Sequence, residues 1–223
     1  MKLAQYIANY SNPQATVQRL RRRRFRLFWE MLQQIPPPRQ VLDVGGNQPY
    51  WEMMSLEYSL AGTQVVLLNL QAVPVRLDGF SSLAGDGRDL SRFADQEFDL
   101  VHSNSTIEHV GDLADQRRMA LEMQRVGQGY FIQTPNRNFP IEPHFLLPLF
   151  QFYPATLQAW LLTHMAFGHS ERLADEAAAR DLLAHTRMLI EGEFRELFPQ
   201  ASIFRERFLG MTKSFVALHP AES

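Results

Sequence analysis

Two histidines stand where general acid–base chemistry could act on a substrate. His109 follows Glu108 shortly after a predicted strand at residues 99–103, and His144 ends the segment 141–144. An imidazole has a pKa near neutrality, so either ring could take a proton from a substrate hydroxyl. We predict His109 and His144 as catalytic residues. Capping a helix or packing into the core is the alternative role for each.

The chain has no cysteine, which excludes a thiolate nucleophile, a disulfide framework and a cysteine metal site. No two histidines or carboxylates share one predicted element at a metal-ligand spacing, so the sequence predicts no metal. The absence of Cys is compatible with a reducing compartment, and we expect a cytoplasmic protein. The longest apolar stretch, residues 145–167, is interrupted by Pro148 and Pro154, which disfavours a membrane span.

A glycine-bearing turn follows the apolar run at residues 41–44, which is broken only by Asp43. Such a run is typical of a strand buried on both faces of a parallel sheet. Glycine after it lets the chain turn sharply and lets a ligand approach the backbone. We therefore predict Gly45, Gly46 and Asn47 as ligand-binding residues. A turn without a ligand is the alternative. Asp43 is interpreted as a buried carboxylate that accepts hydrogen bonds from backbone N–H groups and so fixes the turn.

Strands and helices alternate along most of the chain. Helices are predicted at residues 15–35, 50–60, 113–126 and 174–197. Strands are predicted at 41–44, 64–70, 99–103, 129–134, 203–208 and 214–218, with a further short strand that leads into residues 85–86. This alternation predicts an α/β fold with a mainly parallel sheet that ends in an antiparallel strand pair.

Charge is balanced overall and concentrated locally. The formal net charge of −2 gives no general attraction to nucleic acid. Six arginines lie between residues 19 and 26 of the first predicted helix. They form a solvated helix face, or they steer an anionic substrate, a lipid head group at a membrane surface, or RNA.

In this order, the segments resemble class I S-adenosylmethionine-dependent methyltransferases of the small-molecule type, over residues 41–218. In that family the first strand ends in a loop with three alternating glycines. Gly45 occupies the first of these positions, Asn47 the second and Pro49 the third. Asn tolerates a left-handed backbone, so the loop can keep its shape.

The resemblance also assigns residues on the second and third strands. Asn69 stands where the family carries an acidic residue that binds the ribose hydroxyls. Residues 85–90 (GDGRDL) are similar to the family's Gly-Asp-Ala-x-Asp-Leu motif. By this resemblance Asp86 accepts from the adenine amino group and the backbone N–H of Gly87 meets a ring nitrogen. Capping its own turn is the alternative role for Asp86.

The resemblance implies a single Rossmann-like domain over residues 1–223, with helices on both faces of a seven-stranded sheet. Residues 1–38 would form an N-terminal helical extension, and residues 139–170 an aromatic insert over the substrate site. Ser103 and Asn104, at the exit of the fourth strand, complete the predicted cofactor site.

The function implied is methyl transfer from S-adenosylmethionine to a small-molecule, lipid-like or glycan-like acceptor, anionic or apolar, by in-line displacement. A non-catalytic protein that binds the cofactor is one alternative. An NAD(P) oxidoreductase is another, although Pro49 and Asn69 do not fit its pattern. We expect the aromatic insert to cover an apolar acceptor, with Arg137 at its entrance beside His144. The rival interpretation packs these aromatic side chains onto the sheet and the first helix.

Overall fold

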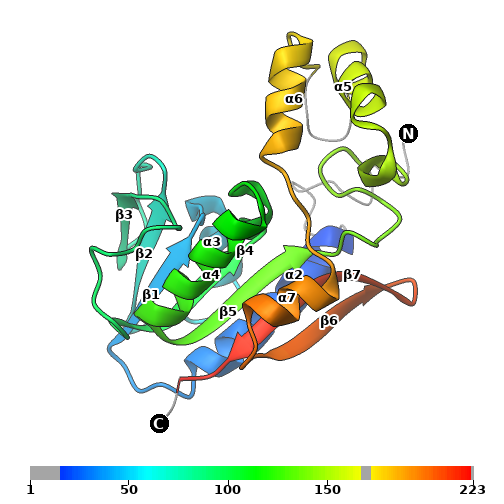
Figure 1. Cartoon of the computed structure of the whole chain (residues 1–223). Coiled ribbons are helices and arrows are strands. Elements are labelled where there is room, and N and C mark those ends of the chain that lie inside the picture. The colour runs from blue at the N-terminus through cyan, green and yellow to red at the C-terminus, as the bar shows by residue number, and fades with distance from the viewer. Residues whose placement is uncertain (1–15, 167–171, 222–223) are drawn as a thin grey trace.

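The computed structural model describes residues 16–166 and 172–221, and within them the chain forms one seven-stranded sheet (Figure 1). The predicted segments 1–38 and 139–170 therefore lie partly outside the described residues. The strands are β1 (Arg39–Val44), β2 (Thr63–Asn69), β3 (Phe80–Ala84), β4 (Phe98–Asn104), β5 (Gly127–Pro135), β6 (Ser202–Phe208) and β7 (Met211–His219). Their order is β3-β2-β1-β4-β5-β7-β6. The first five run parallel, and β7 runs antiparallel to both β5 and β6, which confirms the predicted sheet.

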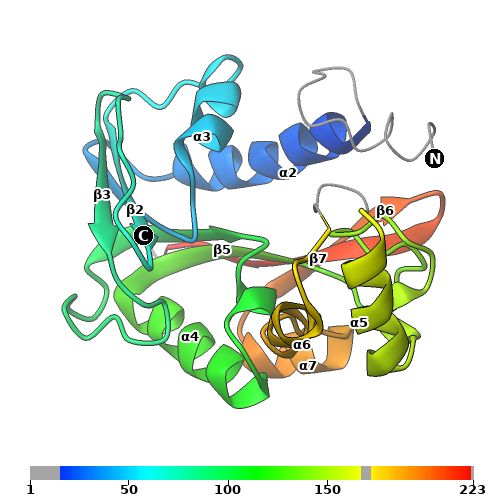
Figure 2. The ribbon, with the colours of Figure 1, turned by 90° about the horizontal axis from the view of Figure 1, so that it is seen from above.

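Helices cover both faces of this sheet, as predicted. The α-helices are α2 (Thr16–Leu32), α3 (Gln48–Ser55), α4 (Leu113–Val126), α5 (Ala155–His164), α6 (Glu176–Ala184) and α7 (Glu191–Leu197), and short 3-10 helices lie at Ile107–His109 and Phe150–Phe152. Figure 2 shows α2 and α3 on one side of the sheet and α4 and α7 on the other. None of the described helices combines the length and the apolar character needed to cross a membrane.

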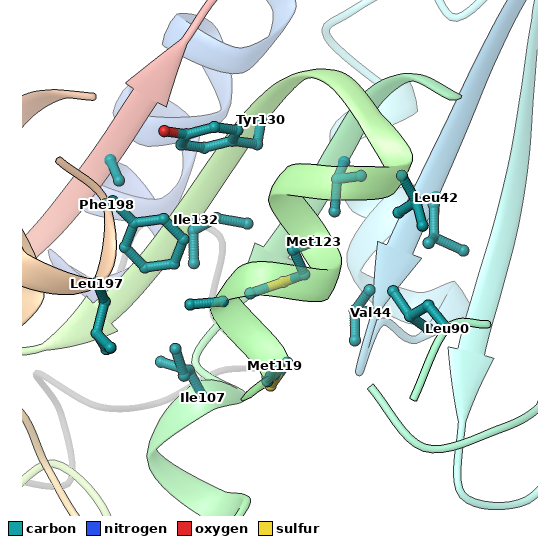
Figure 3. Close-up of a cluster of buried hydrophobic side chains, with 14 of the residues drawn as sticks. Leu42, Val44, Leu90, Ile107, Met119, Met123, Tyr130, Ile132, Leu197 and Phe198 are labelled. Carbon is teal, nitrogen blue, oxygen red and sulfur yellow. The ribbon is translucent and has the colours of Figure 1, made fainter. Parts of the chain in front are cut away.

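Alternating strand side chains build one core on each face. On one face, Met119 and Met123 of α4 lie between Val44 of β1 and Phe198 after α7 (Figure 3). On the other face, α2 and α3 bury Phe28 and Trp51, whose rings meet edge to face with centroids 5.7 Å apart. The first helix is therefore part of the main core.

The predicted helix at residues 174–197 is wrong in its middle, because the chain forms two helices, α6 and α7, with an extended link between them. The link is bonded to the rest of the molecule: the N–H of Arg187 donates to the carbonyl of Glu108 (2.7 Å), and the carbonyl of Leu189 accepts from Arg137 (3.0 Å). Leu189 is fully buried. These long-range bonds replace the helical bonds that the local sequence favours.

The segment between β5 and α7 builds its own small core beside the sheet. The pair α5 and α6 stands beyond the end of β5 (Figure 1). Its buried side chains are Phe145, Phe150, Ala159, Leu162 and Ala179. Phe152 and Trp160 are each 51% exposed. Phe145 and Phe150 thus pack within the insert, whereas Phe139, at its start, meets Phe208 of β6 with ring centroids 6.4 Å apart. Whether the insert covers a substrate stays a prediction.

Candidate functional site

The glycine turn after β1 needs glycine for two reasons. Gly45 has a φ of +79°, a left-handed conformation that side chains disfavour. A Cβ on Gly45 would also lie 2.3 Å from the side chain of Thr106, at the exit of β4. The N–H of Gly45 donates to the carbonyl of Leu68 (2.8 Å), which joins the turn to β2. The turn is thus fixed against both neighbouring strands.

A buried carboxylate holds the same turn from below. Asp43 is 1% exposed; it accepts a hydrogen bond from Trp51 Nε1 (2.6 Å) and bonds to His102 Nδ1 (2.8 Å). His102 is stacked on Phe131, with ring centroids 5.4 Å apart. A Cβ on Gly46 would lie 1.7 Å from Asp43 Oδ2, so only glycine fits above the carboxylate. Asp43 is buried as predicted, but its hydrogen bonds in the described structure go to the side chains of Trp51 and His102 and not to backbone N–H groups.

His102 was not singled out from the sequence, although a signal exists. It is a polar residue inside a buried strand, as Asp43 is, and the two are register partners on adjacent strands. Two titratable residues at matching places on neighbouring buried strands indicate a paired, buried interaction.

A cavity of about 200 Å³ opens above this turn, at the carboxyl ends of β1 and β4. Four of the predicted cofactor residues line it: Gly45, Gly46, Asn47 and Asn104. Asn47 also caps α3, accepting from the N–H of Tyr50 (3.1 Å). Arrangements of this kind, outside the carboxyl ends of parallel strands, are where open α/β sheets bind ligands.

The first helix supplies the remaining wall of this cavity. Arg21 and Gln18 of α2 line it, together with Tyr50 of α3. Other arginines of the run are in ion pairs, with Arg22 bound to Glu57 (2.9 Å). The run is therefore only partly directed at the cavity, through Arg21.

Two further predicted residues use their side chains to hold the backbone around the turn. Asn69 Nδ2 donates to the carbonyl of Gly46 (2.9 Å), and Ser103 Oγ donates to the carbonyl of Val44 (2.9 Å). Ser103 is fully buried. Neither is among the residues that line the cavity. Their contact with a cofactor stays a prediction, and their shown role is to shape the loop.

Asp86 is engaged by a neighbouring cation. Arg88 Nη2 lies 2.6 Å from Asp86 Oδ2, and the N–H of Arg88 donates to Asp86 Oδ1 (2.9 Å). Bonding to Arg88 holds the pKa of Asp86 below its usual range. Gly87 packs against β1, since a Cβ there would lie 2.8 Å from Val44 Cγ1. These contacts match the capping alternative for Asp86, and its bond to adenine stays a prediction.

The two predicted catalytic histidines come together, although 35 residues separate them. His109 Nε2 lies 3.1 Å from His144 Nε2, and His144 Nδ1 lies 2.5 Å from Glu142 Oε1. Glu108 is fully buried beside them and accepts from Thr134 Oγ1 (3.1 Å). The ligand atoms of Glu108, His109 and His144 all lie within 4.8 Å of one another, which is close enough to hold a metal ion.

The surroundings change the protonation of this cluster. Burial raises the pKa of Glu108 to about 7. Desolvation, together with the charge of His144, lowers the pKa of His109 to about 4. Burial works against a charged His144, but the hydrogen bond and charge of Glu142 outweigh it and raise the pKa of His144. At neutral pH His109 is therefore uncharged and offers a lone pair.

A second cavity, of about 300 Å³, lies under the insert. Phe145 and Phe150 form part of its apolar wall, and Arg137 and Glu142 part of its polar wall. Because Glu142 also bonds to His144, this cavity adjoins the histidine cluster. Arg137 lines this cavity and His144 does not, and the lining mixes polar and apolar side chains. The role of the insert as a cover over a substrate stays a prediction.

Residues 42–132 match the family described as a methyltransferase domain. The match runs from within β1 to within β5, and so includes the glycine turn, the third-strand motif and Glu108–His109. No curated protein sequence matches the chain.

Solved structures share the fold at low identity. A Bordetella parapertussis chain, described as a possible exported protein, is 13% identical with a TM-score of 0.56, covering 92% of this chain and 68% of that one. A chain from a complex of the Haloferax volcanii Trm112 methyltransferase activator is 14% identical with a TM-score of 0.51, covering 85% and 84%. The CurJ carbon methyltransferase is 10% identical with a TM-score of 0.50, covering 86% and 51%. At such low sequence identities, these structural similarities show the fold alone.

Proposed function

We propose that this chain, a class I S-adenosylmethionine-dependent methyltransferase, methylates a small-molecule, lipid-like or glycan-like acceptor. Bound S-adenosylmethionine supplies an electrophilic methyl group that the acceptor displaces in line. The observation that carries the proposal is the cavity at the joined ends of β1 and β4, bounded by the glycine turn and by Asn104. A site of this kind promotes displacement by aligning donor and acceptor.

The chain's own groups suit such a cofactor. The cavity presents the backbone of Gly45 and Gly46 and the amides of Asn47 and Asn104, which can donate and accept hydrogen bonds. We assign these four residues to binding of the cofactor. Asn104 directly precedes the segment that carries His109. Asn69, Asp86 and Gly87 remain assigned to its ribose and adenine, by resemblance.

We assign activation of the acceptor to the histidine cluster. An acceptor hydroxyl must lose a proton as it is methylated, and the uncharged ring of His109 can receive it. His144 and Glu142 support that ring from behind. The adjoining cavity under the insert supplies apolar side chains for the body of the acceptor, with Arg137 on its wall for an anionic group. A cytoplasmic location also remains part of the proposal.

Cofactor binding is tested by titration calorimetry with S-adenosylmethionine and its demethylated product. Gly45→Val should abolish binding, since a side chain there collides with Thr106 and strains the turn. Gly210→Val is the matched control: Gly210 has a φ of +80°, but nothing lies within 4 Å of a Cβ there. Equal binding by Gly45→Val and the parent would refute this placement of the cofactor.

Acceptor activation is tested on whichever acceptor a panel of phenolic, glycan and lipid-like compounds reveals. His109→Gln should lower turnover about 100-fold or more while cofactor binding is kept, because that is the contribution of a general base. His164→Gln, on the exposed face of α5, is the control. Unchanged turnover in His109→Gln would remove His109 from the chemistry.

A further inference from the structure

The side chains of Glu108, His109 and His144 converge from two separate segments. Two follow each other in the 3-10 helix after β4, and the third comes from the insert after β5. We propose that these three residues form a binding site for a divalent transition metal ion of the zinc type. One carboxylate and two imidazoles are a common donor set for such ions.

The distance between the imidazoles fits a shared ion. Two nitrogen atoms bound to one tetrahedral zinc at about 2.0–2.1 Å lie about 3.3 Å apart. The Nε2 atoms of His109 and His144 are 3.1 Å apart. The three ligand atoms all lie within 4.8 Å of one another, so the side chains, Glu108 among them, need to close in only slightly to bind one ion.

A carboxylate behind His144 fixes which ring nitrogen is available. Glu142 Oε1 lies 2.5 Å from His144 Nδ1, and Glu142 Oε2 accepts from the N–H groups of His144 (2.8 Å) and Phe145 (2.7 Å). The carboxylate is thus held in place and selects the ring form with hydrogen on Nδ1. This leaves the Nε2 lone pair pointing at His109. Metal-binding histidines are commonly backed by a carboxylate in this way.

Glu108 provides an independent observation. Its side chain is fully buried, Oε2 is bonded to Thr134, and Oε1 has no hydrogen-bond partner among the described residues. A buried carboxylate oxygen without a partner is costly. A hydrogen bond between the two histidines would explain their 3.1 Å contact, but it would leave this oxygen unpaired. An ion between the three side chains accounts for both features.

The site also has an open side. His109 is exposed, so a fourth position on the ion remains for water or for an oxygen atom of the substrate. With His109 bound to the ion, the ion would replace the free His109 ring as the group that activates the acceptor, by lowering the pKa of an acceptor hydroxyl in that position. This catalytic use rests on the proposed function, whereas metal binding itself does not.

The experiment measures metal binding alone. Tag-free protein is stripped with a chelator and titrated with Zn²⁺ by calorimetry, and with Co²⁺ by visible absorption. We expect one ion per chain. His109→Ala and His144→Ala should each weaken Zn²⁺ affinity at least 100-fold. Glu142→Gln, which keeps the shape of the side chain behind His144, should weaken it about 10–100-fold.

His185→Ala is the matched control, since His185 is exposed and lies 3.4 Å from an acidic side chain, that of Asp181. Circular dichroism establishes that each variant is folded, and Glu108→Gln, which keeps the size of the side chain, serves if an alanine variant is not. Absence of stoichiometric binding, or equal affinity in the parent and His109→Ala, would overturn the metal site. Because no cofactor or acceptor is present, neither result depends on methyl transfer. Full methylation by chelator-treated enzyme would overturn the catalytic use of the ion and leave the proposed function intact.

Discussion

Replacing Gly46 with alanine tests how the turn after β1 is held. The new Cβ would lie 1.7 Å from Asp43 Oδ2, whereas real contacts are rarely below 3.0 Å, so the carboxylate or the turn must move by more than 1 Å. Asp43 is bonded to Trp51 at 2.6 Å and to His102 at 2.8 Å, and neither bond survives such a shift. A hydrogen bond to a charged group contributes about 1.5–3 kcal/mol. We therefore expect Gly46→Ala to lower the free energy of unfolding by about 2–4 kcal/mol.

Urea unfolding followed by tryptophan fluorescence measures this change. With a slope of about 2 kcal/mol per molar urea, the midpoint should fall by about 1–2 M. Gly192→Ala is the control, because Gly192 lies in the first turn of α7 and nothing lies within 4 Å of a Cβ there. It should gain about 0.5–1 kcal/mol from helix propensity. A loss below 0.5 kcal/mol in Gly46→Ala would refute the view that Asp43 is held rigidly.

A double-mutant cycle separates the collision from other effects. In an Asp43→Ala background the carboxylate is gone, so Gly46→Ala should cost less than 1 kcal/mol. Coupling of 2 kcal/mol or more is expected for two residues in such contact. If the losses of unfolding free energy in the two single variants simply add up in the double variant, the destabilisation by Gly46→Ala does not come from the collision with Asp43.

Three further predictions concern one buried and two half-buried polar side chains. Burial, with the nearby charge of Arg24, lowers the pKa of Lys213 to about 8 from 10.5. Between pH 8 and 10.5 the unfolded chain therefore binds more protons than the folded chain, and the free energy of unfolding should rise with pH by roughly 3 kcal/mol. Urea unfolding at pH 7.5 and 10.5 should show this rise in the parent and not in Lys213→Met. Gln116→Leu removes hydrogen bonds to the carbonyls of Ile107 and Arg187; it should cost about 2–4 kcal/mol in urea unfolding, and no loss would contradict the role of this side chain. Asn69→Asp, although it restores the acidic residue of the resembled family, replaces a donor to the Gly46 carbonyl by an acceptor; thermal melting should show about 1–2 kcal/mol of destabilisation, and a stabilised variant would contradict it.

The strands and the helix α4 follow from the sequence because their patterns are local. Residues 113–126 carry apolar side chains at helical spacing, and the predicted helix has the observed bounds. The break between α6 and α7 could not be predicted in this way. Its cause is the pairing of Leu189 with the exit of β5, more than 50 residues earlier.

The site was predictable only where one segment carries the signal. The glycine turn at residues 45–47 does so, and these residues line the cavity. His109 and His144 were each predicted by residue type, but their contact was not, because His144 reaches His109 from a separate segment through the fold of the insert. Asn69 and Ser103 show the converse: each stands at the expected place, but its side chain is used to hold the loop. Residue type and position alone do not say which way a side chain is bonded.

The bonding of the glycine turn has a consequence for the kinetics of the enzyme. Gly46 rests on Asp43, and Asp43 is bonded to residues of α3 and β4 inside the core. The entropy of ordering this loop is therefore lost when the protein folds and not when the cofactor arrives. At the cofactor site proposed above, such a preorganised loop would bind cofactor and demethylated product alike, because both would meet the same rigid backbone. Release of the demethylated cofactor, and not closure of the loop, would then be the rate-limiting step of repeated turnover.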